Sequence, residues 1–294
     1  MTEPVAVGLV GAGPWAALVH APMLAAGPHT RLAGVWARRP TAAAEVAGRH
    51  GAEAFDDVDA LFAACDAVAF CVPPDVQAAL AVRAAAAGRH LLLEKPLAGD
   101  LSAASALVDS IAAAGVGSMM VLTWRYAARV RAGLEEARSL APFGGRGRFL
   151  GGGLLGGMFA TPWRLERGPL LDVGPHVIDL LEAALGPVVD VRAHGDLLGW
   201  VGLLLEHEGG AVSEASLCST SRMPVHRSGI EVYGLDGSVD IDCTAAVDSD
   251  TFATLADELA TLVRTGGAHP LDAAHGLHLQ RLLAAAEGQL TARK

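Results

Sequence analysis

Apolar runs alternate with amphipathic segments along residues 5–122 of the chain. An uninterrupted apolar run such as AVAFCV, residues 67–72, is typical of a parallel strand that is buried on both faces. The pattern predicts strands at 5–11, 31–37, 67–72, 90–95 and 116–122, with helices at 14–26, 40–50, 75–88 and 101–114. This alternation predicts an α/β fold with a doubly wound parallel sheet.

The pattern changes after residue 122, which predicts two domains, 1–122 and 123–294. Consecutive strand-like runs joined by short turns predict a mainly antiparallel sheet in the second domain. The expected elements are strands at 188–194, 198–207, 211–219, 228–234 and 237–242, and helices at 126–138, about 250–264 and 271–288. The glycine-rich segment 144–157 carries interleaved Leu, Met and Phe, which favours an edge strand or a bend.

Composition narrows the class of protein. The chain has 294 residues, 52% of them hydrophobic, which is enough for a sizeable core. A net charge of −10 argues against a nucleic-acid partner. The four cysteines show no C-x-x-C spacing, and the N-terminus resembles a strand and not a leader. No apolar run is long enough to span a bilayer. We therefore expect a cytoplasmic protein without a membrane partner.

A glycine turn follows the first predicted strand. Gly11, Gly13 and Ala16 form a G-x-G-x-x-A pattern that opens a helix, with Pro14 suited to the first helical turn. In this setting the first glycine permits the tight turn and the second lets the backbone approach a pyrophosphate. The anion is then bound by the helix N-terminus. Trp15, next to the glycines, is a candidate to cover the cofactor or to pack in the core.

The end of the second strand indicates which dinucleotide binds. An acidic residue usually stands there to bind the ribose 2′-hydroxyl of NAD. Here Ala37 holds that place, and Arg38 and Arg39 follow it. Guanidinium groups without a competing carboxylate favour a 2′-phosphate. The expected cofactor is NADP(H), with NAD(H) as the alternative if the arginines only begin a solvated helix.

A second anchor follows the strand at 90–95. Glu94, Lys95 and Pro96 stand at its carboxyl end, where open α/β sheets bind their ligands. Pro96 restricts Lys95 to an extended conformation, and the peptide bond between them is a candidate for the cis form. A lysine fixed there reaches across the cofactor crevice. By itself the E-K-P triplet is more typical of a strand end with a surface lysine.

Residues 169–181, PLLDVGPHVIDLL, have helical spacing of apolar positions. Asp172, His176 and Asp179 share one face of that helix. The face is either a proton-handling site or a set of packed and solvated polar groups, and the helix alone does not decide between them.

Taken together, these segments resemble the Gfo/Idh/MocA family of oxidoreductases. The resemblance covers the glycine turn, HAPML, CVPPD with Pro73, EKPLA, Arg125 in LTWRY, and WRLERGPLLDVGPHVIDLL. It implies an N-terminal Rossmann domain and a C-terminal α/β domain with a large, mainly antiparallel open sheet. In the family this sheet commonly serves subunit association, which implies a homodimer or homotetramer.

The resemblance also assigns roles. It implies catalysis by Lys95, Asp172 and His176 in one site, with His176 as general acid/base, Lys95 polarising the substrate oxygen and Asp172 orienting the substrate. The cofactor-binding candidates are Gly11, Gly13, Pro14, Trp15, Ala16, Arg38, Arg39, Pro73, Glu94 and Lys95. The substrate-binding candidates are Arg125, Trp163, Asp172 and His176.

The implied activity is hydride transfer between NADP(H) and a carbinol or carbonyl carbon of a sugar, cyclitol or related small polar molecule. The alternatives are a catalytically silent nucleotide-binding sensor of the same fold, and a reductase of another bond such as an imine or a dihydrodiol.

Three features bear on these assignments. The family's glycine run before D-x-G-x-H is replaced here by LERGP, and Pro175 interrupts the helix between Asp172 and His176. The C-terminal domain is shorter than in many members of the family. His275 and His278 are three residues apart, but no third ligand is evident, so no metal is expected.

Overall fold

A computed structural model describes residues 3–292. The chain forms two compact units. The first comprises the residues up to Val121 together with Phe252–Leu277, and the second comprises Leu122–Thr251 together with the residues from His278 on. The predicted division into domains 1–122 and 123–294 stays a prediction.

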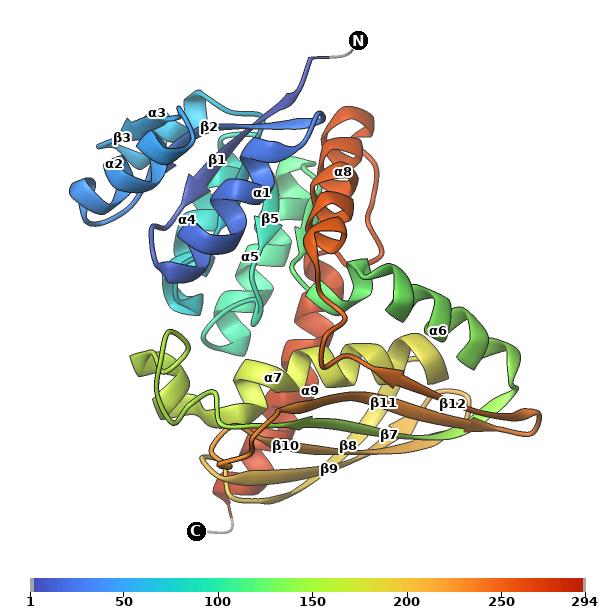
Figure 1. The fold of residues 1–294 in the computed structure, drawn as a ribbon. Coiled ribbons are helices and arrows are strands. Elements are labelled where there is room, and N and C mark those ends of the chain that lie inside the picture. The colour runs from blue at the N-terminus through green and yellow to red at the C-terminus, as the bar shows by residue number, and fades with distance from the viewer. Residues whose placement is uncertain (1–2, 293–294) are drawn as a thin grey trace. The chain divides into compact units, whose positions relative to one another are not determined.

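The first unit is built on sheet A, which contains six parallel strands in the order β3-β2-β1-β4-β5-β6. The strands are β1 (Val5–Val10), β2 (Thr30–Trp36), β3 (Glu53–Phe55), β4 (Ala67–Phe70), β5 (His90–Leu93) and β6 (Ser118–Met120) (Figure 1). Every residue of β1 and β4 is buried, as expected for central strands of a sheet covered on both faces. The predicted doubly wound parallel sheet is confirmed.

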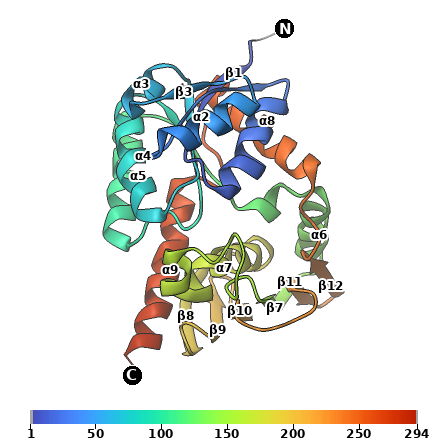
Figure 2. The same cartoon turned by 60° about the vertical axis from the view of Figure 1, so that its left-hand side comes forward.

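Helices connect these strands. They are η1 (Ala16–His20), α1 (Ala21–Ala26), α2 (Pro40–Arg49), α3 (Val58–Ala63), α4 (Pro74–Ala86) and α5 (Leu101–Ala114), and α4 and α5 lie side by side in Figure 2. The pattern of apolar residues did not predict β3 and α3. β3 has only three residues, none of them buried, so it has no apolar run to reveal it. α3 is a short helix whose first turn is capped by the Asp57 carboxylate, which accepts a hydrogen bond from the Asp59 backbone N–H.

A segment distant in sequence completes the first unit. Most of α8 (Ser249–Thr265) and the loop after it belong there. The loop is tied to β6, because the Met120 backbone N–H donates to the Leu271 carbonyl and the Ser118 hydroxyl accepts from the Ala273 N–H. No run of local residues signals these bonds, since they join positions more than 150 residues apart.

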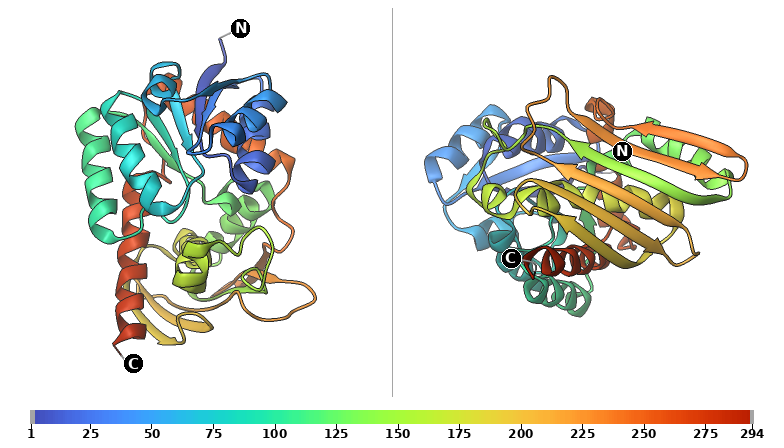
Figure 3. Two further views of the ribbon diagram at one scale, coloured as in Figure 1. Left: turned by 90° about the vertical axis from the view of Figure 1, so that its left-hand side faces the viewer. Right: turned by 90° about the horizontal axis from the view of Figure 1, so that it is seen from below.

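The second unit is built on sheet B, six strands in the order β12-β11-β7-β10-β9-β8. They are β7 (Pro142–Leu150), β8 (Val188–Gly195), β9 (Trp200–His207), β10 (Val212–Cys218), β11 (Arg227–Gly234) and β12 (Gly237–Asp242). Only β7 and β10 pair in parallel, so the predicted mainly antiparallel open sheet is confirmed. Alternate residues of β9, such as Leu203 and Leu205, are buried. The other face is open in the right-hand view of Figure 3, with α7 (Pro162–Leu185) behind the strands.

The first part of the glycine-rich segment is an interior strand and not an edge strand, which corrects that part of the prediction, whereas residues 151–157 form bends and turns. This first part is β7, which pairs with β10 on one side and β11 on the other. The glycines are there because α7 packs closely over the strand. A Cβ on Gly147 would lie 2.4 Å from the Val177 side chain, and one on Gly145 would lie 3.0 Å from Leu185. The close packing of α7 on β7 therefore explains why this strand contains glycines.

Two more helices complete the second unit, α6 (Ala128–Ser139) and the main part of α9 (Ala273–Thr291). α9 covers the edge strand β8. The Gln289 side-chain amide donates to the Val191 carbonyl and accepts from the Ala193 N–H. A side chain that occupies the free backbone groups of an edge strand protects it from pairing with another chain.

α9 is also joined to α7 by a charged pair. The His278 ring Nε2 donates to Oε1 of Glu182 at 2.5 Å. This hydrogen bond raises the pKa of His278 above its usual value; partial burial opposes the shift and the Glu182 charge adds to it. Because the proton is bound more tightly in the folded state, the pair stabilises the fold fully below the unfolded pKa of about 6.5 and loses its effect as pH rises through the folded pKa.

We expect the substitution His278→Leu to lower the melting temperature more at pH 5.5 than at pH 9. The difference between the wild type and the variant should shrink as pH rises through the region above about 6.5. Thermal melts followed by circular dichroism over this pH range measure the difference. His194→Leu, on the exposed part of β8, is the control. A difference that is the same at every pH would show that only the packing of the ring matters.

Candidate active site

The glycine turn lies between β1 and η1. Gly11 has a φ of +123°, and a Cβ there would lie 2.3 Å from the Cys71 carbonyl oxygen, so only glycine fits. At Gly13 no protein atom lies within 4 Å of the Cβ position, which leaves space at the backbone. Ala16 is fully buried, as close packing of helix and strand requires. These positions suit the pyrophosphate of a dinucleotide.

A cavity of about 340 Å³ opens beside this turn. It is lined by Gly11, Ala12, Gly13, Trp36, Ala37, Arg38, Arg39, Ala42, Cys71, Val72, Pro73 and Val76. Five of the cofactor-binding candidates are therefore among its lining residues, namely Gly11, Gly13, Arg38, Arg39 and Pro73. Among the described residues that line it, none is acidic. The cavity wall is therefore formed by glycine backbone at the turn and by guanidinium groups at Arg38 and Arg39.

The remaining cofactor candidates lie next to the turn but do not line this cavity; they are Pro14, Trp15, Ala16, Glu94 and Lys95. Glu94 connects several of them. One oxygen of its carboxylate accepts the Trp15 indole N–H at 2.9 Å and the His20 Nε2–H at 2.8 Å. The other accepts the Lys95 backbone N–H at 3.3 Å. The Trp15 ring also meets Phe252 edge-on, at 6.5 Å between centroids.

The environment of Glu94 keeps its carboxyl ionised. Burial on its own raises the pKa of this group, but the hydrogen bond and charge of His20, the charge of Lys95 and the indole hydrogen bond outweigh burial. The pKa of Glu94 is therefore lower than usual. An ionised carboxylate accepts all of these hydrogen bonds at once, so Glu94 fixes both Trp15 and the start of the E-K-P segment.

Gln77 on α4 holds the same segment from behind. Its side-chain oxygen accepts the Glu94 N–H at 2.9 Å, and its amide donates to the carbonyls of Glu94 at 2.7 Å, Leu97 at 3.0 Å and Pro96 at 3.4 Å. Gln77 is fully buried, so these bonds replace the water that the backbone groups would otherwise bind. The Lys95–Pro96 peptide bond is cis, as the sequence suggested. The backbone on both sides of Lys95 is thus fixed by one side chain.

The second group of candidates lies on α7, which bends at Gly168. There φ is +68° and ψ −168°, and a Cβ would lie 2.0 Å from the Leu197 carbonyl oxygen. The helical stretch that carries the predicted site therefore begins at Pro169, where a missing N–H has no cost. The backbone stays helical through Pro175, so the proline does not break the turn between Asp172 and His176.

Asp172, His176 and Asp179 each contact a residue from another part of the second unit. Asp172 accepts a hydrogen bond from Arg164 Nε at 2.9 Å. The His176 ring lies 5.1 Å from the Trp124 ring, between centroids. Asp179 is almost fully buried and accepts from Arg125 Nη1 at 2.6 Å. The α7 face is a row of ordered polar contacts and not a solvated helix surface.

Trp163 stands next to this row. Its ring lies under the Arg164 guanidinium, whose central carbon is 4.6 Å from the ring centroid, and the Phe159 ring is 5.7 Å away. Trp163, a substrate-binding candidate, therefore supports the arginine that binds Asp172. The structure brings Trp163, Asp172, His176 and Arg125 together in the second unit, whereas Lys95 belongs to the first.

Some residues of these sites were not singled out from the sequence. His20 is the first residue of the HAPML stretch, and Gln77 lies within a predicted helix. The sequence pattern predicts no site residue at either position. The ligand atoms of His20, Glu94 and Cys71 lie within 4.8 Å of one another, a set of donors that the sequence spacing did not suggest. That no metal binds stays a prediction. The available signal was a polar residue, Gln77, between the apolar residues Val76 and Ala78.

Comparison with known proteins matches both parts of the chain to one family. Residues 5–122 match the model described as an oxidoreductase family with an NAD-binding Rossmann fold. Residues 141–240 match the GFO/IDH/MocA C-terminal domain. The chain belongs to the GFO/IDH/MocA family. The predicted family and its oxidoreductase class are confirmed.

Curated relatives in the GFO/IDH/MocA family resemble parts of the chain. UDP-N-acetylglucosamine 3-dehydrogenase of Acidithiobacillus ferrooxidans is 35% identical over 167 residues, which are 56% of this chain and 51% of that protein. Inositol 2-dehydrogenase of Rhizobium meliloti is 41% identical over 98 residues, 33% of this chain and 28% of that protein. The match thus spans about half of the first relative and less of the second.

A solved structure supports the fold over the whole chain. GenD2 from gentamicin A biosynthesis, in complex with NAD, superposes with a TM-score of 0.87 at 22% identity, covering 100% of this chain and 96% of that one. This likeness concerns the fold alone. No helix within residues 3–292 is both long and apolar enough to cross a lipid bilayer.

Proposed function

We propose that this protein is an NADP(H)-dependent oxidoreductase that transfers hydride between the nicotinamide ring and a carbinol or carbonyl carbon of a sugar, cyclitol or related small polar molecule. The observation that carries the proposal is the cavity at the glycine turn with arginines among its lining residues. The names of the relatives point the same way, since UDP-N-acetylglucosamine 3-dehydrogenase, galactose 1-dehydrogenase and inositol 2-dehydrogenase are all dehydrogenases.

The side chains of the candidate site suit the proton transfer that accompanies hydride transfer. His176 would take the proton from a substrate hydroxyl or return it to a carbonyl oxygen, since an imidazole titrates near neutral pH. Lys95 would polarise that oxygen, with its backbone held by Gln77. Asp172, kept in place by Arg164, would orient the substrate. The bound nicotinamide supplies the hydride donor or acceptor.

The preference for NADP(H) depends on the residues that follow β2. Ala37, Arg38 and Arg39 line the cavity where a ribose-binding carboxylate is usual, and the described lining residues carry no negative charge. Guanidinium groups form paired, charge-assisted hydrogen bonds with phosphate oxygens. NAD(H) is the alternative, and the solved relative GenD2 contains NAD.

Titration of the protein with NADPH and with NADH, followed by nicotinamide fluorescence, tests this preference. We expect NADPH to bind about tenfold more tightly or better, which corresponds to about 1.4 kcal/mol. Arg38→Ala should weaken NADPH binding by roughly 10–100-fold and leave NADH nearly unchanged. Arg49→Ala, at the far end of the same helix α2 and outside the cavity, is the matched control. Tighter binding of NADH by the wild type would refute the preference.

Turnover distinguishes an enzyme from a silent sensor. A panel of polyols, cyclitols, ketosugars and sugar nucleotides, followed by the absorbance of reduced nicotinamide, should reveal at least one substrate. Inclusion of imines and dihydrodiols covers the alternative bond types. Tight dinucleotide binding without turnover of any panel member would favour the sensor.

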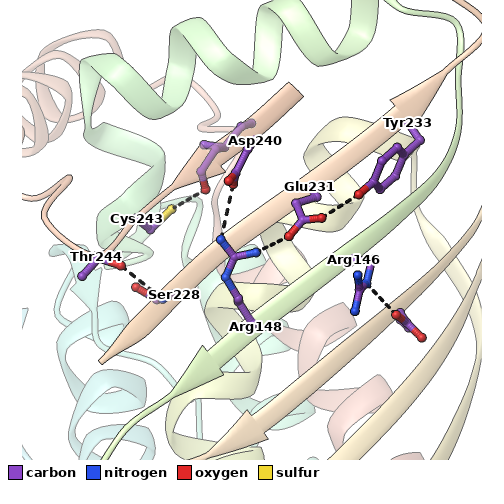
Figure 4. A network of polar contacts seen from close by, with 10 residues as sticks. Arg146, Arg148, Ser228, Glu231, Tyr233, Asp240, Cys243 and Thr244 are labelled. Carbon is purple, nitrogen blue, oxygen red and sulfur yellow. Dashed lines mark hydrogen bonds and ion pairs between the residues drawn. The ribbon is translucent and has the colours of Figure 1, made fainter. Parts of the chain in front are cut away.

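The open face of sheet B is the proposed contact between subunits, as a homodimer or homotetramer. Alternating charges line its strands: Arg146 pairs with Glu214, and Arg148 with Glu231, whose other oxygen accepts the Tyr233 hydroxyl (Figure 4). Large apolar side chains of the second unit are also exposed, among them Trp200, Leu204 and Val212. A patch that mixes aromatic and apolar groups with arginines suits a protein interface. A monomeric mass by light scattering would contradict this proposal.

A cytoplasmic location is likewise proposed, and no metal or nucleic-acid partner is included.

A further inference from the structure

Arg164 lies close to Asp172 because α7 bends between the two residues. It lies on the first stretch of α7, before the bend at Gly168, and Asp172 lies on the second. The bend lets the two meet although they are eight residues apart, with Arg164 Nε donating to Asp172 Oδ1 at 2.9 Å. The arginine is therefore beside the carboxylate to which the proposed function assigns substrate orientation.

The contacts of the guanidinium leave part of it available. Nε is used by Asp172, and Nη1 has a long contact of 3.4 Å to the Thr161 hydroxyl. Nη2 has no hydrogen-bond acceptor among the described residues, and the side chain is 18% exposed. Because a guanidinium carries five N–H donors, several of them remain for a ligand.

The aromatic neighbours fix the orientation of this group. Trp163 and Phe159 lie against the guanidinium, at 4.6 and 5.7 Å from its central carbon. The N–H groups of the guanidinium, and not the neighbouring rings, provide the hydrogen-bond donors for an oxygen ligand. A planar donor held in this way loses little rotamer freedom when a ligand binds.

Arg125 forms a similar ion pair with the second carboxylate of this face, Asp179. Arg125 is 18% exposed, and its partner Asp179 is only 1% exposed. The Asp172 side chain is 12% exposed, less than that of Arg164. On the α7 face, therefore, each guanidinium group is more exposed than the carboxylate that it binds.

We propose that Arg164 determines substrate choice by binding an anionic group, a carboxylate or a phosphate, carried by the sugar or cyclitol. This inference rests on the proposed oxidoreductase function and narrows its substrate class. A carboxylate or phosphate offers two oxygens in one plane and matches two N–H donors of a guanidinium, whereas a hydroxyl satisfies only one. Charge-assisted hydrogen bonds are also about twice as strong as neutral ones. Asp172 does not fill this role, because of the N–H groups of Arg164 only Nε–H donates to it.

The test compares sugars that differ only in charge. The probes are D-galactose, D-galacturonate and D-galactose 6-phosphate, and the corresponding glucose set. Calorimetric titration of the protein saturated with reduced dinucleotide gives each dissociation constant without turnover. We expect the wild type to bind at least one acidic probe tenfold or more tightly than its neutral partner. Comparison of the carboxylate probes with the phosphate probes shows which of the two anionic groups binds more tightly.

Variants of Arg164 distinguish two roles of this residue, binding the anionic group of the substrate and holding Asp172 in place. Arg164→Met should remove the preference, because the affinity for acidic probes should fall about tenfold more than the affinity for neutral ones, and Arg164→Lys should restore part of the preference. Arg167→Met is the matched control, since Arg167 lies on the same stretch but pairs with Glu287, and it should keep the preference. A melting temperature measured for each variant shows that it is folded.

Two results would overturn the inference. One is a wild type that binds no acidic probe more tightly than its neutral partner. The other is an equal loss of affinity for acidic and neutral probes in both Arg164 variants, which would make Arg164 only a positioning residue for Asp172. Failure of the proposed function is a different result: no probe would be oxidised with either dinucleotide, whatever the binding preference.

Discussion

Replacement of His176 by asparagine is expected to lower kcat by roughly 10²–10⁴-fold, the range by which a positioned general acid/base accelerates a reaction. Asparagine is smaller but keeps hydrogen-bonding groups, and it cannot exchange a proton near neutral pH. Affinity for the dinucleotide should change little, because the residues that line the dinucleotide cavity belong to the first compact unit.

Steady-state kinetics with the best substrate of the panel, together with fluorescence titration of NADPH, measures both quantities. The pH dependence of kcat/KM adds a third readout, since the limb due to the histidine should disappear in the variant. His194→Asn, at an exposed position of β8, is the control. Because the His176 ring packs against Trp124, thermal melts must show that the variant is folded. Unchanged turnover would show that the acid/base is another group.

Gly168→Ala is expected to destabilise the protein by about 2–6 kcal/mol, the sum of backbone strain and steric overlap. The φ of +68° with ψ of −168° is a conformation that only glycine adopts readily, and the added Cβ would lie 2.0 Å from the Leu197 carbonyl oxygen. For a domain of this size, the melting temperature should fall by roughly 5–20 °C.

Gly210→Ala is the matched control for Gly168→Ala. Gly210 also has a positive φ, +83°, but no atom lies within 4 Å of its Cβ position, so only the strain of about 1 kcal/mol remains. Differential scanning calorimetry of the two variants and the wild type measures both effects. An equal loss of stability in the two variants would show that the overlap with Leu197 relaxes and that conformation alone decides the cost.

Much of the fold could be predicted from the sequence because its signals are local. The buried runs of β1 and β4 and the turn at Gly11 are short patterns that have one main structural meaning in an α/β protein. The same holds for the alternation in β9, where one face is buried and the other open. The helical spacing of residues 169–181 also agrees with the structure, where these residues follow the bend of α7 at Gly168.

Other features depend on pairs of residues far apart in the chain, and no local pattern reveals them. The glycine-rich composition of residues 144–157 predicts an edge strand or a bend. The glycines of β7 instead make room for Val177 and Leu185 of α7. Gln77 could not be connected with the E-K-P segment, because the contact joins a helix to a strand end 17 residues later. The assignment of Arg164 as the partner of Asp172 required the bend at Gly168.

The sequence by itself determined the order of most strands and helices, with β3 and α3 as exceptions, and the glycine turn after the first strand. These are set by backbone preferences and by the burial of apolar side chains within one element, which act over a few residues. Tertiary structure alone decided which partners surround the candidate site residues, including His20 and Gln77 at the E-K-P segment and Arg164 at Asp172. Hydrogen bonds and charges act across space, so their partners are fixed only when the chain has packed.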